Sequence, residues 1–338
     1  IGATPFLYGR MDADVDLVAE PQRVAAGDSV AGLMRVSAPS GSGSRRMVVD
    51  VPVGPDVLRF EAPPLSEGER FEDVFVVPTE RRSVIPVGPA TTRRGDPLGI
   101  WSRNRHWTNV TEIFVRPRMV GLDALGAGIL RDLEGVSSHE LSPSDLAFHA
   151  LREYEPGDDL RHIHWRSTAK TGTYMVRQFL DTRRAHLALI VDTNIGSYTD
   201  DSEFELAMST AASLAVRSLA DEYQVSIVAG DQLVVGDTGG SVLDSACRVV
   251  MDSSDLVRNS LNASRQLSDC SLVFALSGPG GSFPDVQRAL ATFAPEVRKF
   301  VLRVDPHKRT GIESAGLHTI LNLAKLEELP MLLKWSVQ

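Results

Sequence analysis

The sequence predicts a two-part α+β protein, in which an antiparallel β-sandwich precedes a doubly wound α/β unit. Residues 11–118 consist of short runs in which apolar and polar residues alternate, with turn residues between the runs and no helical period. From His186 onward, apolar strands alternate with amphipathic helical segments, which is the order typical of a parallel sheet covered by helices. A chain of 338 residues is long enough for two domains.

The N-terminal strands are expected to form a sandwich of immunoglobulin-like architecture over residues 11–118. In the first segment Met11, Ala13, Val15 and Leu17 alternate with aspartates, which gives one apolar face and one polar, solvent-facing face. Many short strands joined by turns are typical of such sandwiches. Further strands are expected at residues 30–36, 47–53, 71–77, 83–87 and 113–115.

The C-terminal unit is expected over residues 186–338, with residues 119–185 as a connector. The run from His186 to Val191 is continuously apolar and ends at Asp192, as a buried parallel strand does. A helix is expected at residues 203–222, with Ser202 and Glu205 as its capping box. Strands are expected at residues 225–229, 272–276, 300–304 and 319–322, with helices near 242–251 and from 284 and 324.

The composition of the chain limits the classes of function that it can have. The net charge of −9 argues against a general nucleic-acid binder, because phosphate recognition needs a basic face. The two cysteines, Cys247 and Cys270, make neither a disulfide framework nor a zinc cluster and are expected as reduced, buried thiols. No apolar run reaches the roughly 18–20 residues that span a bilayer. No cofactor is expected.

The connector contains an unusual cluster of opposite charges around the turn signal Pro156-Gly157. Arginines there can make forked hydrogen bonds to carboxylates, which predicts a stiff loop or hairpin held by ion pairs. We expect Arg152, Asp158 and Arg161 to be buried, mutually bonded and close to the sandwich or the α/β sheet. The complete network is expected to comprise Arg152, Tyr154, Pro156, Gly157, Asp158, Arg161, Trp165 and Lys170.

This cluster resembles a known signature. The order Arg152-Glu153-Tyr154, Pro156-Gly157-Asp158, Arg161, Trp165 and Ala169-Lys170 resembles that of the bacterial "domain of unknown function 58" family. Upstream, Arg81-Arg82-Ser83 and Asp96-Pro97-Leu98-Gly99 look like the lead-in of the same family. The resemblance implies a hydrophobic membrane anchor before Ile1, a location on the cytoplasmic face of the cell membrane, and a MoxR-type AAA+ ATPase as partner.

The loop after Asp192 resembles the metal loop of a von Willebrand factor A domain. Such domains bind a divalent ion through Asp-x-Ser-x-Ser, with a Thr and an Asp on other loops. Here Asn194 and Gly196 replace the two serines, and Ser277 stands where the later Asp is expected. We therefore expect no working metal site, with Asp192 as the only ligand if an ion binds at all. Protein-binding loops are expected at Asp192, Asn194, Tyr198, Thr238, Ser277 and Phe283, with Tyr198 and Phe283 exposed.

The favoured function is a non-enzymatic scaffold or adaptor that binds other proteins and works with the ATPase in their assembly or maturation. The alternative is a metal-dependent enzyme or sensor that uses His162, His164 and Asp158. A third hypothesis is an RNA or anionic-lipid patch made by Arg161, Arg166, Lys170, Arg177, Arg183 and Arg184. It is disfavoured because Glu153, Glu155, Asp158 and Asp159 lie alongside.

Overall fold

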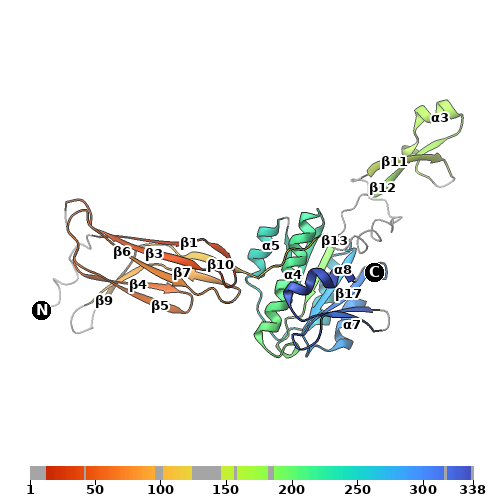
Figure 1. Ribbon diagram of the computed structural model, residues 1–338. Coiled ribbons are helices and arrows are strands. Elements are labelled where there is room, and N and C mark those ends of the chain that lie inside the picture. Colours follow the sequence, from red (N-terminus) through yellow and green to blue (C-terminus); the bar gives the residue numbers. More distant parts are fainter. Residues whose placement is uncertain are drawn as a thin grey trace.

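The computed structural model contains a β-sandwich, an α/β unit and a small hairpin that stands apart from both (Figure 1). It describes residues 13–41, 43–95, 102–123, 146–155, 158–181, 186–236, 238–315 and 318–335. Within these ranges, no helix combines the length and apolarity needed to cross a membrane. The lead-in residues 96–99 lie outside the described residues.

Two sheets make the sandwich. The smaller has three antiparallel strands in the order β1-β3-β6, and the larger has seven, in the order β2-β10-β7-β4-β8-β9 with β5 on β4. The strands are β1 (Asp14–Glu20), β2 (Arg23–Ala25), β3 (Val30–Ser37), β4 (Met47–Val53), β5 (Asp56–Ala62), β6 (Arg70–Val77), β7 (Ser83–Val87), β8 (Thr91–Gly95), β9 (Ser102–His106) and β10 (Thr111–Arg116).

One apolar core holds the two sheets together. Met34 of the smaller sheet and Val49, Val51 and Ile113 of the larger sheet are fully buried in the same cluster. Alternation along the strands produces this core, since every second residue of β3 is buried. The predicted two-sheet sandwich is therefore present, over strands that run from Asp14 to Arg116.

The α/β unit is built on a seven-stranded sheet in the order β15-β14-β13-β16-β17-β19-β18. The five central strands are parallel, and the two edge strands are antiparallel to their neighbours. The strands are β13 (His186–Val191), β14 (Gln224–Ala229), β15 (Gln232–Gly236), β16 (Leu272–Ser277), β17 (Arg298–Val304), β18 (Gly311–Ala315) and β19 (His318–Leu323).

Helices cover both faces of this sheet. Helices α4, α5 and α8 contribute to the core on one face, and α6 and α7 to the core on the other. Strand β13 has six buried residues in succession because both of its faces are covered, as its apolar run predicted. The helical segments are η2 (Ile195–Ser197), α4 (Asp201–Ala220), α5 (Gly239–Ala246), α6 (Leu256–Gln266), α7 (Phe283–Ala291), η3 (Leu326–Glu328) and α8 (Leu329–Trp335).

Arg82, in the turn between β6 and β7, joins the sandwich to the α/β unit. Its Nε and Nη2 donate to the two carboxylate oxygens of Glu205 at 3.1 and 2.9 Å. Its Nη1 donates to the carbonyls of Ala246 and Val249 at 2.6 and 2.5 Å, and the guanidinium lies 5.5 Å from the ring of Phe204. The Arg82 side chain is 2% exposed, so this arginine is anchored inside the neighbouring unit.

A second contact surrounds Asp244 of α5. Arg116 donates to its Oδ1 from Nε and Nη2 at 2.9 and 2.7 Å, and Arg23 donates to its Oδ2 at 2.8 Å. Nearby, Arg23 and Arg248 lie at 5.4 and 5.5 Å from the ring of Phe114. Arginines do join the two units, but they come from the sandwich and from the segment after α5 rather than from the connector signature.

Glu205 differs from its predicted role. Asp200 caps α4, because its Oδ1 accepts the N–H groups of Ser202 and Glu203 at 2.8 and 3.2 Å. The predicted capping box of Ser202 and Glu205 is wrong because an aspartate two residues earlier takes the capping position. Glu205 is thereby free to accept Arg82.

The first residues of the predicted connector pack on the α/β unit. Leu122 belongs to the core on the α4 face, and Val120 packs against it. The Val120 N–H also donates to the Ser213 hydroxyl of α4 at 3.1 Å. The chain thus contacts the α/β core immediately after it leaves the sandwich.

Candidate functional site

The signature residues form a small antiparallel hairpin with a helical insertion. Strands β11 (Leu146–Glu153) and β12 (Met175–Asp181) pair, with Arg152 opposite Val176. Between them lie a single turn, η1 (Leu160–His162), and a short helix, α3 (Trp165–Thr171). The hairpin predicted from the turn and charge pattern is therefore present.

Arg152 and Asp158 clamp the start of the insertion. Arg152 Nη1 donates to Asp158 Oδ2 at 2.8 Å, and Nη2 donates to Oδ1 at 2.6 Å. Asp158 Oδ2 also accepts the Glu155 N–H at 2.9 Å. The hydrogen bond from Arg152, followed by the one from Glu155, holds the pKa of Asp158 below its usual value. Pro156 and Gly157, at the predicted turn, lie outside the described residues.

Arg161 does not join this clamp, and its predicted burial is wrong. Its side chain is 90% exposed and lies 3.7 Å from Asp159, which is itself half exposed. Asp158 has both oxygens engaged by Arg152. The number of carboxylates nearby suggested a buried partner for Arg161. The neighbouring Asp159 instead caps η1 by accepting the Arg161 N–H.

Local bonds define both ends of α3. His164 is the N-cap, with its Nδ1 accepting the Ser167 N–H at 3.2 Å and lying 2.8 Å from the Ser167 hydroxyl. Gly172 ends the helix in the left-handed region at φ 78°, which glycine adopts without strain. Ile163 and Val176 pair in an isolated antiparallel β-bridge, and both are buried. The insertion is thus held by a clamp, a cap and a β-bridge.

These contacts bear on the enzyme or metal hypothesis for His162, His164 and Asp158. Asp158 is committed to Arg152, and the Nδ1 of His164 to the helix cap. Across the parts of the chain that the structure describes, no group of three or more His, Cys, Asp or Glu side chains is placed to hold a metal ion. The structure assigns two of the three proposed groups to local architecture.

The hairpin exposes aromatic and aliphatic side chains. Trp165 is 64% exposed, Tyr174 57% and Leu160 63%. Trp165 packs edge-on against Tyr174 with centroids 6.3 Å apart, and half-buried Tyr154 makes the same kind of contact with Tyr174 at 6.3 Å. Leu160 and Tyr174 were missed from the sequence; the apolar residue in the charged Asp-Asp-Leu-Arg run was the available signal.

The loop after β13 places Asp192 at the carboxyl end of the sheet, where doubly wound folds bind ligands. Asp192 is 4% exposed, and both of its oxygens are engaged. Oδ1 accepts the Asn194 N–H at 3.0 Å, and Oδ2 accepts the Ser277 hydroxyl at 2.8 Å. Ser277 therefore acts as a donor where a second carboxylate would be an ion ligand. Each oxygen of the buried Asp192 carboxylate thus accepts a hydrogen bond from this edge of the sheet.

Two residues that the sequence did not single out complete this loop. Asp252 Oδ1 accepts the Thr193 hydroxyl at 2.7 Å, and the Ser254 hydroxyl lies 2.8 Å from the same Thr193 oxygen. Asn194 Nδ2 donates to the Ser254 carbonyl at 3.0 Å. The loops after β13 and α5 are therefore closed on each other by their own polar groups.

The predicted aromatic contacts of these loops are not exposed. Tyr198 is 7% exposed, and its hydroxyl donates to the Asp192 carbonyl at 2.5 Å, so its predicted exposure is wrong. Burial, with Asp192 and Glu203 nearby, raises the pKa of Tyr198 well above its usual value. Phe283 is half buried at the start of α7. Thr238 caps α5 by accepting the Ser241 N–H, so it belongs to a local helix end.

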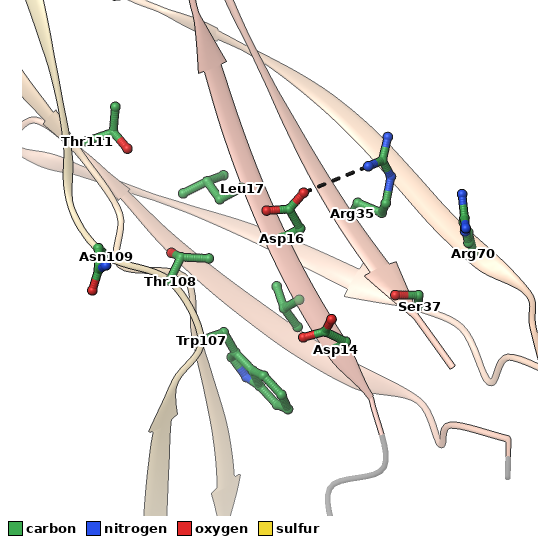
Figure 2. A pocket seen from close by; sticks show the side chains of 11 residues that line it. Asp14, Asp16, Leu17, Arg35, Ser37, Arg70, Trp107, Thr108, Asn109 and Thr111 are labelled. Atoms are coloured by element: carbon green, nitrogen blue, oxygen red, sulfur yellow. Dashed lines mark ion pairs between the residues drawn. The ribbon is translucent and has the colours of Figure 1, made fainter. Parts of the chain in front are cut away.

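A separate polar groove lies on the sandwich (Figure 2). It encloses about 600 Å³ and is lined by Asp14, Asp16, Arg35, Arg70, Trp107 and Asn109, among others. Arg35 bonds Glu72 at 2.6 Å and lies 3.8 Å from Asp16, while Arg105 covers the Trp107 ring at 3.8 Å. Within the groove, Arg35 and Asp16 thus lie close enough for a long ion pair.

Comparison with known proteins gives one informative match and some weak ones. No curated protein matches the chain. The CARDB domain of the PF1109 protein from Pyrococcus furiosus, solved in complex with di-metal ions, is similar over 31% of this chain and 92% of that domain, at 13% identity and a TM-score of 0.24. Spo0M, a sporulation control protein from Bacillus subtilis, is similar over 46% of this chain and 59% of its own, at 16% identity and a TM-score of 0.18. Such low TM-scores support no inference about function.

The match to a family model falls on the hairpin and the first part of the α/β unit. Residues 150–241 match the model described as "Protein of unknown function DUF58". This range contains the signature from Arg152 to Lys170 and the loop at Asp192. The match supports the DUF58 family of proteins of unknown function over residues 150–241 of the chain.

Proposed function

We propose that this chain is a non-enzymatic, protein-binding scaffold or adaptor. In this proposal it is tethered to the cytoplasmic face of the cell membrane and works with a MoxR-type AAA+ ATPase in the assembly or maturation of other proteins. The observation that carries the proposal is the exposure of Trp165, Tyr174 and Leu160 on a hairpin that stands apart from the two larger units (Figure 1). Clustered exposed apolar side chains are typical of interaction surfaces, and Trp and Tyr are enriched among the residues that dominate binding energy.

The α/β unit supports an adaptor through its topology. The order β15-β14-β13-β16-β17 corresponds to strands 3-2-1-4-5 of a doubly wound sheet. That order is consistent with a von Willebrand factor A-like domain, which we propose for this unit. With Asp192 engaged by Ser277 and Asn194, the unit would contact proteins without a bridging ion.

The contact surface that we propose differs from the one expected from the sequence. Tyr198 is bonded inside the sheet edge and is not available to a partner. The loops at Asn194, Ser277 and Phe283 are left as secondary contacts, and the hairpin becomes the principal one. A hairpin clamped by Arg152 and Asp158 would present its aromatic residues with little loss of conformational entropy on binding.

Binding to a co-encoded MoxR-type ATPase tests the proposal directly. The combined variant Trp165→Ala and Tyr174→Ala should weaken association at least about tenfold, as the loss of aromatic anchors does in other interfaces. Trp335→Ala is the matched control, because Trp335 is also exposed, at 43%, but lies at the end of α8. Surface plasmon resonance with immobilised ATPase gives the dissociation constants. Equal binding by the hairpin variant and the parent would contradict the proposal.

The alternative function, a metal-dependent enzyme or sensor, predicts a different result. Hydrolase activity of the purified chain that is lost in His162→Ala or His164→Ala would overturn the adaptor proposal. The His164 variant also removes the cap of α3, so His164→Asn, which can still cap a helix, separates catalysis from folding.

A further inference from the structure

One face of the hairpin combines exposed apolar side chains with exposed cations. Helix α3 has no buried residue, and Trp165, Arg166, Ala169 and Lys170 are all exposed on it. Residues three and four positions apart are neighbours on a helix surface, so the pairs 165/169, 166/169 and 166/170 place the four on one side. We call this face, together with exposed Leu160, Arg161 and Tyr174, the hairpin tip.

The cations of the hairpin tip are poorly neutralised. In the part of the chain that the structure describes, neither Arg166 nor Lys170 has an ion-pair partner, and Arg161 makes only the long contact with Asp159 at 3.7 Å. Both carboxylate oxygens of Asp158 accept hydrogen bonds from Arg152. By contrast, Arg82 and Arg116, which lie between the sandwich and the α/β unit, are paired with Glu205 and Asp244.

Trp165, Arg166 and Lys170 together indicate which chemical groups a partner of the hairpin tip should carry. A guanidinium binds a carboxylate through parallel hydrogen bonds, an ammonium binds it as a point charge, and an indole supplies a large apolar contact. A positive patch on a chain of net charge −9 would also orient an acidic partner toward the tip. We propose that the hairpin tip captures an acidic segment of a partner protein that carries apolar residues among its Asp and Glu side chains.

Two polyanions with similar charge are less suited to this surface. A membrane or an RNA presents many phosphates over a wide area, and binding to them depends on several cations without intervening acids. Here Glu153, Glu155 and Asp159 are exposed on the same hairpin. A peptide can place a few carboxylates beside the cations of α3 and avoid these acids, whereas a phosphate surface cannot.

The inference rests on the proposed adaptor function and names the chemistry of its partner. The probe is a fluorescein-labelled peptide that alternates Asp-Glu pairs with Leu-Phe pairs, titrated with the full chain in fluorescence anisotropy. Saturable binding is expected, together with weakening as salt is raised. The variant Arg166→Glu with Lys170→Glu should bind at least about tenfold more weakly, because attraction becomes repulsion.

A peptide of opposite charge and a matched control variant make the peptide-binding test specific. The same variant should bind a peptide in which Lys replaces each Asp and Glu, while the parent should not. The control is Arg258→Glu with Arg265→Glu, which changes the net charge equally at exposed positions of α6 and should leave peptide binding unchanged. Both pairs of positions are exposed, and circular dichroism confirms that each variant remains folded.

The outcomes distinguish this inference from the proposed function. Peptide binding that is indifferent to the reversal at Arg166 and Lys170 overturns the inference. So does stronger binding to phosphatidylglycerol vesicles or to single-stranded RNA than to the acidic peptide. If the reversed variant still binds the ATPase as the parent does, the adaptor function stands and the acidic-segment inference fails. If the peptide binds at the tip but the ATPase does not, the inference stands and that partner is removed.

Discussion

Arg82 and Glu205 connect the sandwich to the α/β unit through a forked ion pair, with N···O distances of 3.1 and 2.9 Å. The Arg82 side chain is 2% exposed, whereas that of Glu205 is 31% exposed. Nη1 of Arg82 donates to the carbonyls of Ala246, the last residue of α5, and of Val249, which lies just beyond it. One side chain therefore ties together two helices and the β6–β7 turn.

Arg82→Ala should lower the free energy of unfolding by about 2–4 kcal/mol, because two backbone carbonyls and one carboxylate lose their donor. The expected loss of stability is smaller than the largest values for broken buried ion pairs, because Glu205 is partly exposed and water can solvate its carboxylate. Arg82→Lys should recover part of the loss, since an ammonium cannot reproduce the fork. Thermal unfolding by circular dichroism measures both.

The neighbouring Arg81 supplies the control for this change. It pairs with Asp201 at the surface, with both side chains more than half exposed, so Arg81→Ala should shift stability by no more than about 0.5 kcal/mol. Equal melting temperatures for the Arg82 and Arg81 variants would show that the fork does not stabilise the assembly of the two units.

The sequence predicts the fold better than the contacts that hold it together. Period-two alternation located β3, β4, β6 and β7 because one face of each strand is buried. Strand β5 was missed: the polar residues of its Asp-Val-Leu-Arg-Phe-Glu-Ala run give it a mostly exposed surface, and its pairing with β4 is a tertiary property. Helix α6 was missed for a similar reason, since only a narrow stripe of it is apolar.

The sequence predicts the partners of individual side chains less well than it predicts strands and helices. The charge cluster correctly indicated that Arg152 and Asp158 lie in an ion-paired hairpin, because the two residues are close in the chain. The charge cluster does not indicate which of several carboxylates each arginine pairs with. The predicted burial of Arg161 is therefore wrong. Arg82 and Glu205 are separated by 123 residues, and no local pattern links them.

Gly278 marks a close approach between two loops at the carboxyl edge of the sheet. A Cβ there would lie 2.2 Å from the Ser197 carbonyl oxygen and 2.5 Å from Tyr198 Cδ1. Gly278→Ala should therefore displace Tyr198 and destabilise the chain by about 1–3 kcal/mol, as overpacking does elsewhere. Gly311→Ala in β18 is the control, because nothing lies within 4 Å of the added carbon. Urea midpoints that shift equally for the two variants would contradict the close approach.

The Arg152–Asp158 clamp predicts the acid response of the hairpin. The pKa of Asp158 is lowered from 3.8, chiefly by the hydrogen bond from Arg152. The clamp is therefore fully present above the unfolded value and is lost as pH falls through the lower folded value. Carboxyl carbon NMR should show Asp158 titrating below pH 3.8, and Arg152→Gln should return its midpoint toward that value. A midpoint unaffected by the Arg152 variant would contradict the clamp.

Both cysteines should behave as buried thiols. Burial raises the pKa of Cys247 to about 11 and that of Cys270 to about 12. Since the thiolate is the nucleophile, alkylation by iodoacetamide at pH 8 should be at least about a hundredfold slower in the folded chain than in urea. Because the folded pKa values lie above the unfolded value of 9.0, their contribution to stability is complete below pH 9 and is lost as pH rises through 11 to 12. Rapid labelling of the folded chain would show that one thiol is accessible.

The hydrogen bonds around Asp192 predict a weak response to divalent ions. A magnesium ion needs several oxygen ligands in octahedral geometry, and Asp192 already accepts from Asn194 and Ser277. Titration calorimetry with Mg²⁺ or Mn²⁺ should show no binding tighter than millimolar. Asp192→Ala should instead destabilise the chain, because the buried Ser277 hydroxyl and the Asn194 N–H lose their acceptor. Micromolar affinity that disappears in Asp192→Ala would mean that an ion replaces these hydrogen bonds, and it would revive the metal-dependent alternative at the edge of the sheet.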